Sequence, residues 1–426
     1  MPQPLFIQIH TLPSYPGSLL NRDDVGFAKR IPFGGTTRTR ISSQCLKRHW
    51  RTFTGEHALS ALHAGSDPVA LSVRSRHTFE RFVLEPLVAE GVSVDLARAA
   101  TEAIMIAVLG ESAKAKKAKE DAKSEDAAPA KGKKTKKDSD QDGAASLMTG
   151  QLTVLGKPEL DFFLSEARAL ARDAGALDKL EDAKKKRFTK EWGKNLDGLR
   201  RAAGLDGALF GRMVTSDKLA RADAALHVAH AMTVHSEHTE TDYFAAVDDL
   251  LQGGDDPQLG SAHIGTTELT SGLFYGYVVV DVAQLVSNLE GGDAKDWLSA
   301  DRKLAADVVR SLVQLVARVS PGAKKGSTAP YAYAHLTFVE VGSGQPRTLA
   351  NAFLRPIVVT TSHPDLVANA YVALTSYVTD VDQVFGLANR RALAAIGPKD
   401  KIAALAPSSS VEAVAKFAAG AVLEHA

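Results

Sequence analysis

The chain has 426 residues, of which 45% are hydrophobic and 6% aromatic, and its 51 lysines and arginines balance 50 aspartates and glutamates. This composition is typical of a globular chain with a sizeable core and excludes a disordered or collagen-like one. A single cysteine, Cys45, excludes a disulfide scaffold and a cysteine-based zinc site. No apolar stretch reaches the roughly 20 residues of a membrane-spanning helix and no signal peptide is evident, so we expect a cytoplasmic protein without a membrane partner.

The first predicted element is a strand over residues 5–12, where apolar and β-branched residues alternate. Two prolines and a glycine follow, and we expect them to end this strand. A long loop then runs to Arg40, with a turn predicted at Gly34 and Gly35. Loops of this length are uncommon in compact domains unless they serve a function.

A helix is predicted over residues 44–53, because Ser42 or Ser43 is a suitable N-cap. Apolar residues at three- and four-residue spacing would pack this helix against a sheet. They are Leu46, Trp50 and Phe53.

Basic residues gather in residues 22–51, where eight lysines and arginines face only two aspartates. On the predicted helix, Lys47 and Arg51 share one face, and Gln44 and Arg48 lie on an adjoining stripe. This helix has no acidic residue four positions away that would pair with its cations. The pattern therefore favours a groove for a polyphosphate chain, such as a nucleic acid, over a solvated basic face.

The rest of the chain is predicted to mix helices and strands. Residues 56–201 are mostly helical, apart from a Lys-rich segment at 113–143 that lacks large apolar residues and is expected to be a disordered insertion. The helical runs are 92–109, 159–170, 180–192, 297–319 and 367–378, and the strands are 208–215, 225–235, 273–281 and 335–341. A helix is an alternative for 225–235. Together these elements predict an α+β fold.

Four histidines close in sequence suggest a metal site: His227, His230, His235 and His238. On a strand, alternate histidines would face opposite sides, so one ion could not collect all four. Ordinary hydrogen-bonded histidines are the favoured interpretation, and we expect no metal or other cofactor.

Enzymatic chemistry has little support in the sequence. Cys45 is more typical of a small buried residue than of a nucleophile. His263 and Glu268 would form an acid–base pair, but no nucleophile, metal or cofactor motif accompanies them. The basic loop at residues 322–327 would either bind phosphate or serve only as a flexible turn. No catalytic residue is predicted.

Residues that would contact bases lie in two places. Single strands are commonly held by cations together with apolar side chains that stack on the bases. Arg212 and Met213 on a predicted strand are candidates, as are Tyr243 and Phe244 beside a Gly-rich hairpin. For each alone, core packing is the alternative.

Several stretches resemble one family, the CasC proteins, which are the RNA-binding backbone subunits of the type I-E CRISPR surveillance complex called Cascade. The most specific match is FIQIHTL, LNRDD, GG and RISSQCLKR in residues 6–51. Further matches are GRMVTS (211–216), AHAMTVH (229–235), DYFAAVDDL (242–250), GSAHIGTTELTSGLFYGY (260–277), PGAKKGS (321–327) and LANAF (349–353). Cys45 stands where the family usually has serine, which argues against a catalytic thiol.

The resemblance implies an α+β fold shaped like a hand, with an RRM-like (ferredoxin-like) palm, helical fingers and an extended β-hairpin thumb. The palm would comprise residues 1–55, 202–235 and 271–426, the fingers 56–201, and the thumb 236–270. The insertion at about 113–143 would lengthen the fingers.

The resemblance also implies a non-catalytic function. Copies of the chain would polymerise along the CRISPR RNA, kink it at regular intervals and present its bases to a target DNA strand, so that base pairing reads the sequence. The implied partners are CRISPR RNA, target DNA, further copies of the chain and other Cascade subunits. The alternative function is a metal-dependent RNA-processing nuclease that uses His263, Glu268 or the histidine cluster.

The resemblance assigns most of the predicted RNA-binding residues, with Met213 and Phe244 as wedges at displaced nucleotides. The backbone-binding positions it implies are Arg22, Lys29, Arg40, Ser42, Gln44, Lys47 and Arg51. The basic pattern adds Arg38, Ser43, Arg48 and Arg212. In the family, a lysine-bearing helix of the fingers contacts target DNA. The residues that resemble its lysines are Lys184, Lys185, Lys186 and Lys190.

Overall fold

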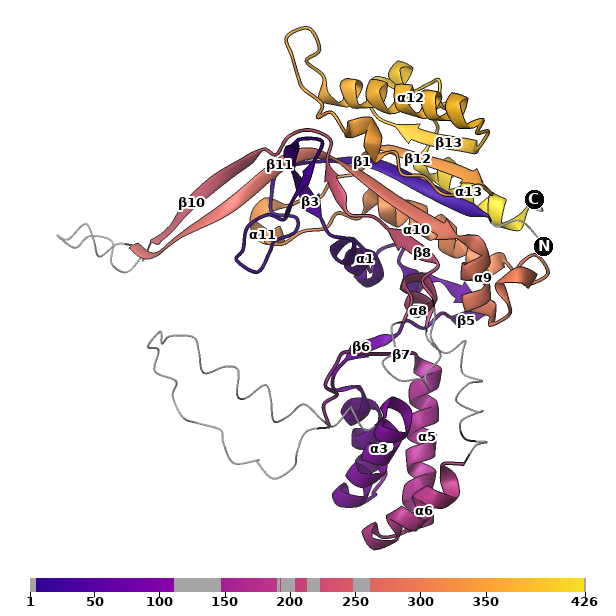
Figure 1. The fold of residues 1–426 in the computed structure, drawn as a ribbon. Coiled ribbons are helices and arrows are strands. Elements are labelled where there is room, and N and C mark those ends of the chain that lie inside the picture. The colour runs from indigo at the N-terminus through magenta and orange to yellow at the C-terminus, as the bar shows by residue number, and fades with distance from the viewer. Residues whose placement is uncertain are drawn as a thin grey trace, which may run out of the picture. The chain divides into compact units, whose positions relative to one another are not determined.

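A computed structural model describes residues 5–110, 147–189, 192, 204–212, 223–247 and 261–424, with the backbone alone for 245–247 and 261–264. The chain divides into two compact units (Figure 1). The sheet unit comprises Met1–Pro68 and Ala225–Ala426, and the helical unit comprises Val69–Ala224. Both helices and strands are present, which confirms the predicted α+β class. Among the helices of the described chain, none is long and apolar enough to cross a bilayer.

Most strands of the sheet unit join one large antiparallel sheet, in the order β13-β12-β1-β11-β9-β3-β2, with β8 and β10 also pairing with β11. A separate short pair is formed by β4 and β5. The strands are β1 (Phe6–Ser18), β2 (Arg30–Phe33), β3 (Thr36–Ile41), β4 (His63–Ala64), β5 (Asp67–Pro68), β8 (Leu226–Val228), β9 (Ala231–Thr233), β10 (Thr239–Val247), β11 (Ser261–Asp281), β12 (Ala334–Gly342) and β13 (Arg390–Ala395).

The first strand is longer than its sequence predicts. β1 continues through its prolines to Ser18, whereas the sequence predicted an end near residue 12. It lies between β11 and β12, and its register shifts after Thr11 and again after Tyr15. Such irregularities let a strand pass residues that cannot donate a ladder hydrogen bond.

Helices cover both faces of the sheet (Figure 1). On one face, α12 (Leu366–Phe385) packs Leu374 and Val378 into a core with Leu12 and Phe338 of the strands. The other face carries α1 (Ser43–Thr52), α9 (Val282–Glu290), α10 (Lys303–Arg318) and α13 (Val411–Leu423). The predicted helices at 44–53, 297–319 and 367–378 are therefore confirmed, with shifted ends, whereas α9, α13 and β13 were not predicted.

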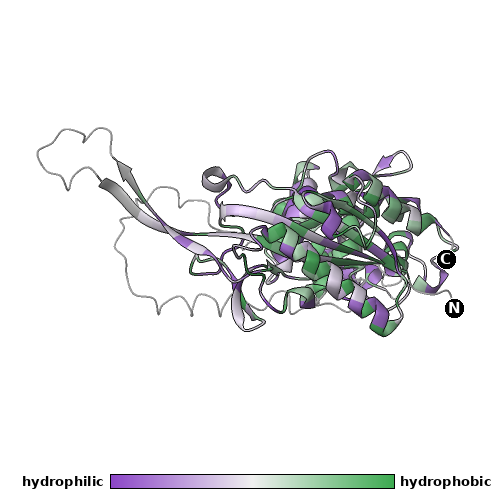
Figure 2. Ribbon diagram, turned by 90° about the horizontal axis from the view of Figure 1, so that it is seen from above, coloured by the Kyte–Doolittle hydropathy of each residue, from purple (hydrophilic) through white to green (hydrophobic). Residues whose placement is uncertain are grey.

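A two-stranded arm extends from the sheet. β10 pairs with the first half of β11, from Thr239 opposite Thr270 to Val247 opposite Ser261. The second half of β11 pairs with β1 and belongs to the sheet, so one continuous strand joins the arm to the core. The centre of the sheet is strongly hydrophobic, while the described part of the arm is mostly pale (Figure 2).

The helical unit has its own core, formed by residues such as Phe79, Ile104 and Phe163. The helices predicted at 92–109 and 159–170 are confirmed with shifted ends, and the one at 180–192 is confirmed as far as Arg187. The Lys-rich segment at 113–143 lies outside the described residues. The elements are β6 (Val73–Ser75), a π-helical turn (Glu80–Leu84), α2 (Glu85–Ala89), α3 (Val94–Leu109), β7 (Thr153–Leu155), α5 (Lys157–Ala174), α6 (Leu180–Arg187) and α8 (Leu205–Phe210).

The strand predicted at 208–215 is wrong where the structure describes it, because residues 205–210 form α8. This helix belongs to the helical unit. The Asp206 carboxylate accepts hydrogen bonds from the backbone N–H and the hydroxyl of Ser72, at 2.6 and 2.7 Å. This contact joins α8 to the segment before β6, which places residues 205–210 in the helical unit.

A second difference lies in the predicted loop before Arg40. The turn at Gly34 and Gly35 is present, with φ of 62° and 80°, and it joins β2 to β3 in a short hairpin. Positive φ at both central residues is typical of a type I′ hairpin turn, which glycine adopts without steric cost.

Candidate nucleic-acid interface

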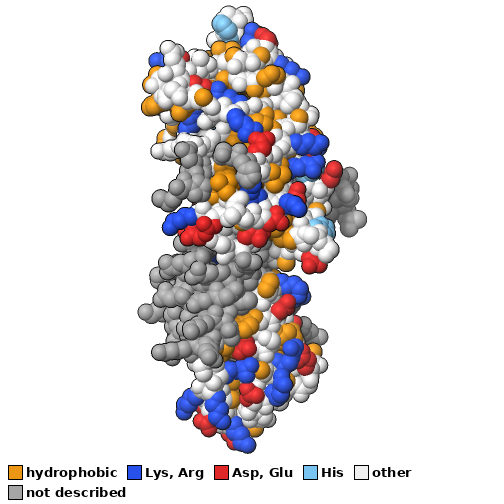
Figure 3. All heavy atoms as spheres, turned by 90° about the vertical axis from the view of Figure 1, so that its right-hand side faces the viewer, with side chains coloured by type: hydrophobic (Ala, Val, Ile, Leu, Met, Phe, Trp, Pro, Cys, Tyr) orange, Lys and Arg blue, Asp and Glu red, His pale blue; other side chains and the backbone are white. Residues whose placement is uncertain are grey.

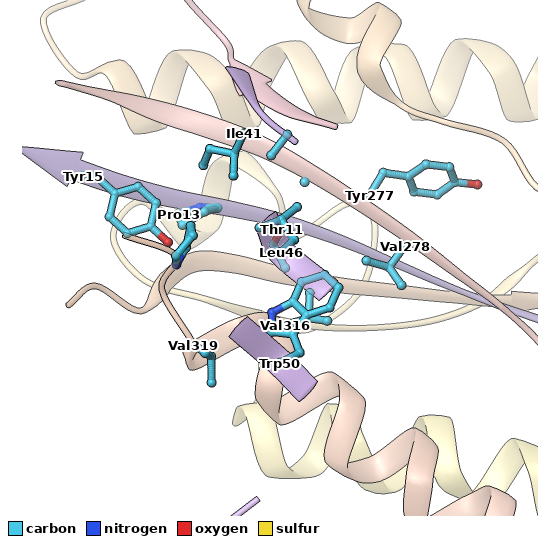
Figure 4. A pocket seen from close by; sticks show the side chains of 13 residues that line it. Thr11, Pro13, Tyr15, Ile41, Leu46, Trp50, Tyr277, Val278, Val316 and Val319 are labelled. Carbon is cyan, nitrogen blue, oxygen red and sulfur yellow. The ribbon is translucent and has the colours of Figure 1, made fainter. Parts of the chain in front are cut away.

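Helix α1 is fixed on the sheet by its apolar side. Leu46 and Trp50 are buried and point into an apolar pocket with Thr11 of β1 and Val316 of α10 (Figure 4). The remaining cavity is about 30 Å³, enough for one or two water molecules and too small for a nucleobase. The pocket therefore belongs to the core.

The beginning of α1 is fixed by hydrogen bonds to neighbouring segments. Ser42 is the N-cap, and its buried hydroxyl accepts a hydrogen bond from the Cys45 N–H at 3.3 Å. The Ser42 N–H donates to the Asn21 side chain at 2.8 Å, and the Ser43 N–H donates to Nδ1 of His230 at 3.1 Å. The predicted N-cap is confirmed, and the Ser42 hydroxyl is occupied by this role.

The loop before β2 brings further cations beside α1. Asp23 Oδ1 accepts hydrogen bonds from three successive N–H groups, those of residues 25 to 27, and Arg22 forms an isolated β-bridge with Ala28. The Lys29 carbonyl accepts a hydrogen bond from the Arg40 N–H at 2.7 Å. The loop thus has a fixed backbone that places Arg22, Lys29 and Arg40 together.

Cations from separate elements surround two neighbouring groups, Cys45 and His230, and Nη1 of Arg40 lies 3.4 Å from Nδ1 of His230. Burial raises the pKa of the Cys45 thiol, and the charges of Lys29, Arg48 and Lys325 oppose that rise. Partial burial and the charges of Arg40 and Lys29 lower the pKa of His230. Lys325 belongs to α11 (Lys325–Thr328), in the basic loop noted in the sequence.

We call this group the cationic strip, and it consists of Arg22, Lys29, Arg40, Arg48 and Lys325. Within the described part of the chain, no member of the strip forms an ion pair with an acidic side chain. Like charges gathered without counter-charges repel one another and attract a polyanion. A single-stranded sugar–phosphate chain has the required density of negative charge.

Two arginines of the same basic segment have other roles. Arg30 forms ion pairs with Glu237 and Glu268. Arg38 is fully buried, and its guanidinium donates hydrogen bonds to the carbonyls of Phe33, Thr233 and Phe353 at 3.3, 3.1 and 2.9 Å. Arg38 therefore stabilises the sheet unit, and its predicted place in the RNA-binding set is corrected.

The predicted wedge residue Phe244 lies on the arm. Its ring is 41% exposed and lies across the strand opposite, where a Cβ on Gly265 would be 2.5 Å from the ring. The ammonium group of Lys324 is 5.6 Å from the ring centroid, and it also hydrogen-bonds the Thr267 hydroxyl. Phe244, opposite Gly265 in the arm, is thus in contact with the loop that carries Lys324 and Lys325.

Comparison with known proteins shows the family of the chain. The sequence profile of a family described as CT1975-like protein matches residues 7–418, most of the chain. The chain belongs to this family of CasC backbone subunits. No curated protein matches it in sequence.

The fold of this CasC chain is similar to that of two solved structures. One, named "CRISPR RNA-guided surveillance complex, pre-nicking", is 24% identical with a TM-score of 0.69, and the comparison covers 98% of this chain and 100% of the other. The second, named "CRISPR RNA-guided surveillance complex", is 23% identical with a TM-score of 0.62, and covers 98% and 99% of the two chains.

The other α1 residues that were predicted to bind RNA in this CasC chain differ in their exposure to solvent. Gln44 is exposed, whereas Ser43, Lys47 and Arg51 are partly buried. The Ser43 hydroxyl donates to the Gln44 side chain at 3.4 Å. These residues lie on the same helix as Arg48, the member of the cationic strip that α1 contributes.

The predicted residues of the helical unit have structural partners. Arg212 is buried and forms an ion pair with Glu159 at 2.6 Å, so its predicted RNA contact is corrected. Lys184 and Lys185 pair with acidic residues three positions earlier, at 2.8 and 3.9 Å, and Lys186 lies on the same helix. Met213 and Lys190 lie outside the described residues.

Within the described residues, no group of three His, Cys, Asp or Glu side chains is placed to hold a metal ion. His235 uses both ring nitrogens: Nδ1 donates to the Ser236 carbonyl at 2.7 Å, and Nε2 accepts from the Leu273 N–H at 3.1 Å. Glu268 accepts a hydrogen bond from the Ala28 N–H at 2.8 Å and pairs with Arg30. The interpretation as ordinary histidines therefore holds for His235.

The face of the molecule drawn in Figure 3 has a different charge pattern, since its lysines and arginines lie interspersed with aspartates and glutamates. The overall balance of charges in the sequence is consistent with that picture.

The cationic strip was found in the sequence by its density of basic residues. Lys325 was noted there only as part of a basic loop, because its closeness to Lys29 depends on tertiary structure.

Proposed function

We propose that this CasC chain binds the backbone of the CRISPR RNA along the cationic strip, without reading its sequence. The observation that carries the proposal is the meeting of Lys29, Arg40, Arg48 and Lys325 from separate elements, with no acidic partner within the described residues. Phosphate contacts position a nucleic acid but carry no sequence information. Sequence would be read by pairing between the guide RNA and the target DNA.

The sheet unit would be the RRM-like palm, the β10–β11 arm the thumb, and the helical unit the fingers. Support for this assignment comes from the antiparallel sheet with helices on its faces and from the continuity of β11 between sheet and arm. Further copies of the chain would stack along the RNA together with the other Cascade subunits.

Phe244 would act as the wedge that displaces a nucleotide. Its ring is partly exposed and is held against Gly265 by Lys324, so little conformational freedom is lost when it meets a base. Loss of one stacked base costs about 1–3 kcal/mol, which the phosphate contacts would offset. The kinked RNA would then present its other bases to the target strand.

The test is RNA affinity as a function of salt concentration. Lys29→Ala and Arg48→Ala should each weaken the binding of unrelated single-stranded RNAs by similar factors. Each should also reduce the slope of log K against log salt by about 0.7, the value for one phosphate contact. Lys295→Ala, an exposed lysine of the same unit, is the matched control and should change neither quantity. Loss of affinity for some sequences only would contradict the proposal and indicate base readout.

We infer further that the chain acts without catalysis. The nuclease alternative uses His263, Glu268 or the histidine cluster as ligand, acid or base. Of these side chains, His235 and Glu268 are occupied by hydrogen bonds within the chain. Incubation of the purified protein with labelled repeat RNA and divalent metal should leave the RNA intact. Cleavage that stops when a chelator is added would contradict this inference.

A further inference from the structure

A short segment after the basic loop is held rigidly on both sides. Pro330 packs on the backbone of Gly322, where an added Cβ would lie 2.6 Å from the proline ring and 3.5 Å from the side chain of Lys325. Two residues later, the Ser320 hydroxyl donates to the Ala332 carbonyl at 2.9 Å and accepts from the Ala332 N–H at 3.0 Å. The backbone between these contacts has little freedom.

Two tyrosines project from this rigid segment. Tyr331 and Tyr333 are 74% and 66% exposed, and the chain between them forms neither helix nor turn. Side chains two positions apart in an extended segment point to the same side. The guanidinium of Arg318, at the end of α10, lies 5.7 Å from the centroid of the Tyr333 ring. The segment therefore presents two aromatic rings and a cation to a ligand.

The charge of the surroundings indicates which ligand. Residues 318–334 contain Arg318, Lys324 and Lys325 and no acidic residue. Lys325, whose side chain neighbours Pro330, is a member of the cationic strip. Aromatic rings beside cations that follow a phosphate chain are the combination that binds single-stranded nucleic acid. An apolar protein segment would not need these positive charges.

We propose that Tyr331 and Tyr333 form a stacking platform for a base of the RNA strand whose phosphates the cationic strip binds. The inference deepens the proposed function and rests on it. Because every base has a π-face, such a platform would hold any sequence. Because its backbone is fixed before RNA arrives, little conformational entropy is lost on binding.

The test compares three variants on two RNAs. The variants are Tyr331→Ala with Tyr333→Ala, Tyr331→Phe with Tyr333→Phe, and the control Phe385→Ala, an equally exposed aromatic residue on α12. The RNAs are a short single strand and the same strand with abasic sugars. We expect the double alanine variant to bind the normal strand about tenfold more weakly with an unchanged salt slope. The phenylalanine variant and the control should bind within about twofold of the parent chain, as a ring-stacking contact requires.

On the abasic strand, the parent chain and the alanine variant should bind equally. An equal loss on both strands, or a lower salt slope, would overturn the platform and indicate a backbone contact. Unchanged affinity for the short strand with weaker assembly on long RNA would overturn it too, and would assign the tyrosines to contacts between copies. If the parent chain itself does not bind RNA, the proposed function fails and the platform fails with it. This result is distinct from a failure of the platform alone, in which the parent chain still binds RNA. Melting temperatures check that each variant is folded.

Discussion

Neighbouring residues of one type have different roles in the basic segment, and burial decides between them. Arg38 and Arg40 lie two positions apart on β3, yet Arg38 is fully buried while Arg40 lies beside His230. The carbonyl partners of Arg38 include Thr233 and Phe353, which are 195 and 315 positions away in the chain. Local sequence therefore predicts where the cations gather, but not which of them are used inside the protein.

This difference predicts opposite phenotypes for two substitutions. Arg38→Ala should lower the free energy of unfolding by about 3 kcal/mol, because three buried carbonyls lose their donor. Arg48→Ala should change it by less than about 0.5 kcal/mol, as is usual at exposed positions, while RNA affinity falls. Denaturant unfolding measures the first quantity and RNA titration the second. Equal stability of the two variants would contradict the assignment of Arg38.

A buried charged network was not predicted. On the face of the sheet covered by α12, the Glu340 carboxylate accepts hydrogen bonds from Arg347 at 3.0 Å and Arg391 at 2.8 Å, and Nε2 of His10 lies 3.5 Å away. Burial alone would raise the pKa of Glu340, yet its pKa lies well below the usual range because His10 and Arg347 stabilise the carboxylate. These residues are far apart in the chain and share no motif, so no sequence pattern predicts the network.

The depressed pKa of Glu340 has a consequence for stability. A carboxyl group with a lower pKa in the folded state stabilises the protein above its unfolded pKa of about 4.3, and this contribution is lost as the pH falls below that value. Glu340→Gln should therefore destabilise the chain by about 3 kcal/mol at pH 7. It should also flatten the fall in unfolding free energy between about pH 5 and pH 3. Parallel curves for the two proteins would contradict this role.

Elements were predicted best where a strong local signal exists. Helix α1 has a capping serine and apolar residues at helical spacing, and its bounds differ from the prediction by one residue at each end. The opposite case is α8, a six-residue helix, which is too short for its period to be distinguished from that of a strand. The β2–β3 hairpin was missed although its turn was predicted, because β2 has only four residues including a proline and β3 is rich in polar residues.

The arm offers a test at the scale of one element. Gly265→Ala would place a methyl group 2.5 Å from the ring of Phe244, so the ring must leave its position. We expect the kink in bound RNA to weaken, measured by energy transfer between labelled RNA ends, while the salt slope stays unchanged because no phosphate contact is lost. Gly344→Ala, which meets no atom within 4 Å, is the control. An unchanged kink would exclude Phe244 as the wedge.

The whole molecule consists of a discontinuous unit and a continuous one. The helical unit is formed by one stretch of chain, Val69–Ala224, with a core of its own. We expect a fragment of residues 69–224 to unfold cooperatively, as followed by circular dichroism. Glu159→Ala in this fragment should cost about 3–5 kcal/mol, because it removes the buried carboxylate that pairs with Arg212. A fragment without a cooperative transition would show that this unit depends on the sheet unit.

The discontinuity of the sheet unit also affects how the protein is made. β1 leaves the ribosome first, but His10 in this strand meets Tyr275 of β11 265 positions later. At about 5–20 residues per second, tens of seconds pass between the synthesis of the two strands. During that interval the contiguous helical unit can complete its fold, while β1 remains an apolar segment with unpaired backbone groups. Newly synthesised chains are therefore most exposed to aggregation, and most in need of a chaperone, before β11 emerges.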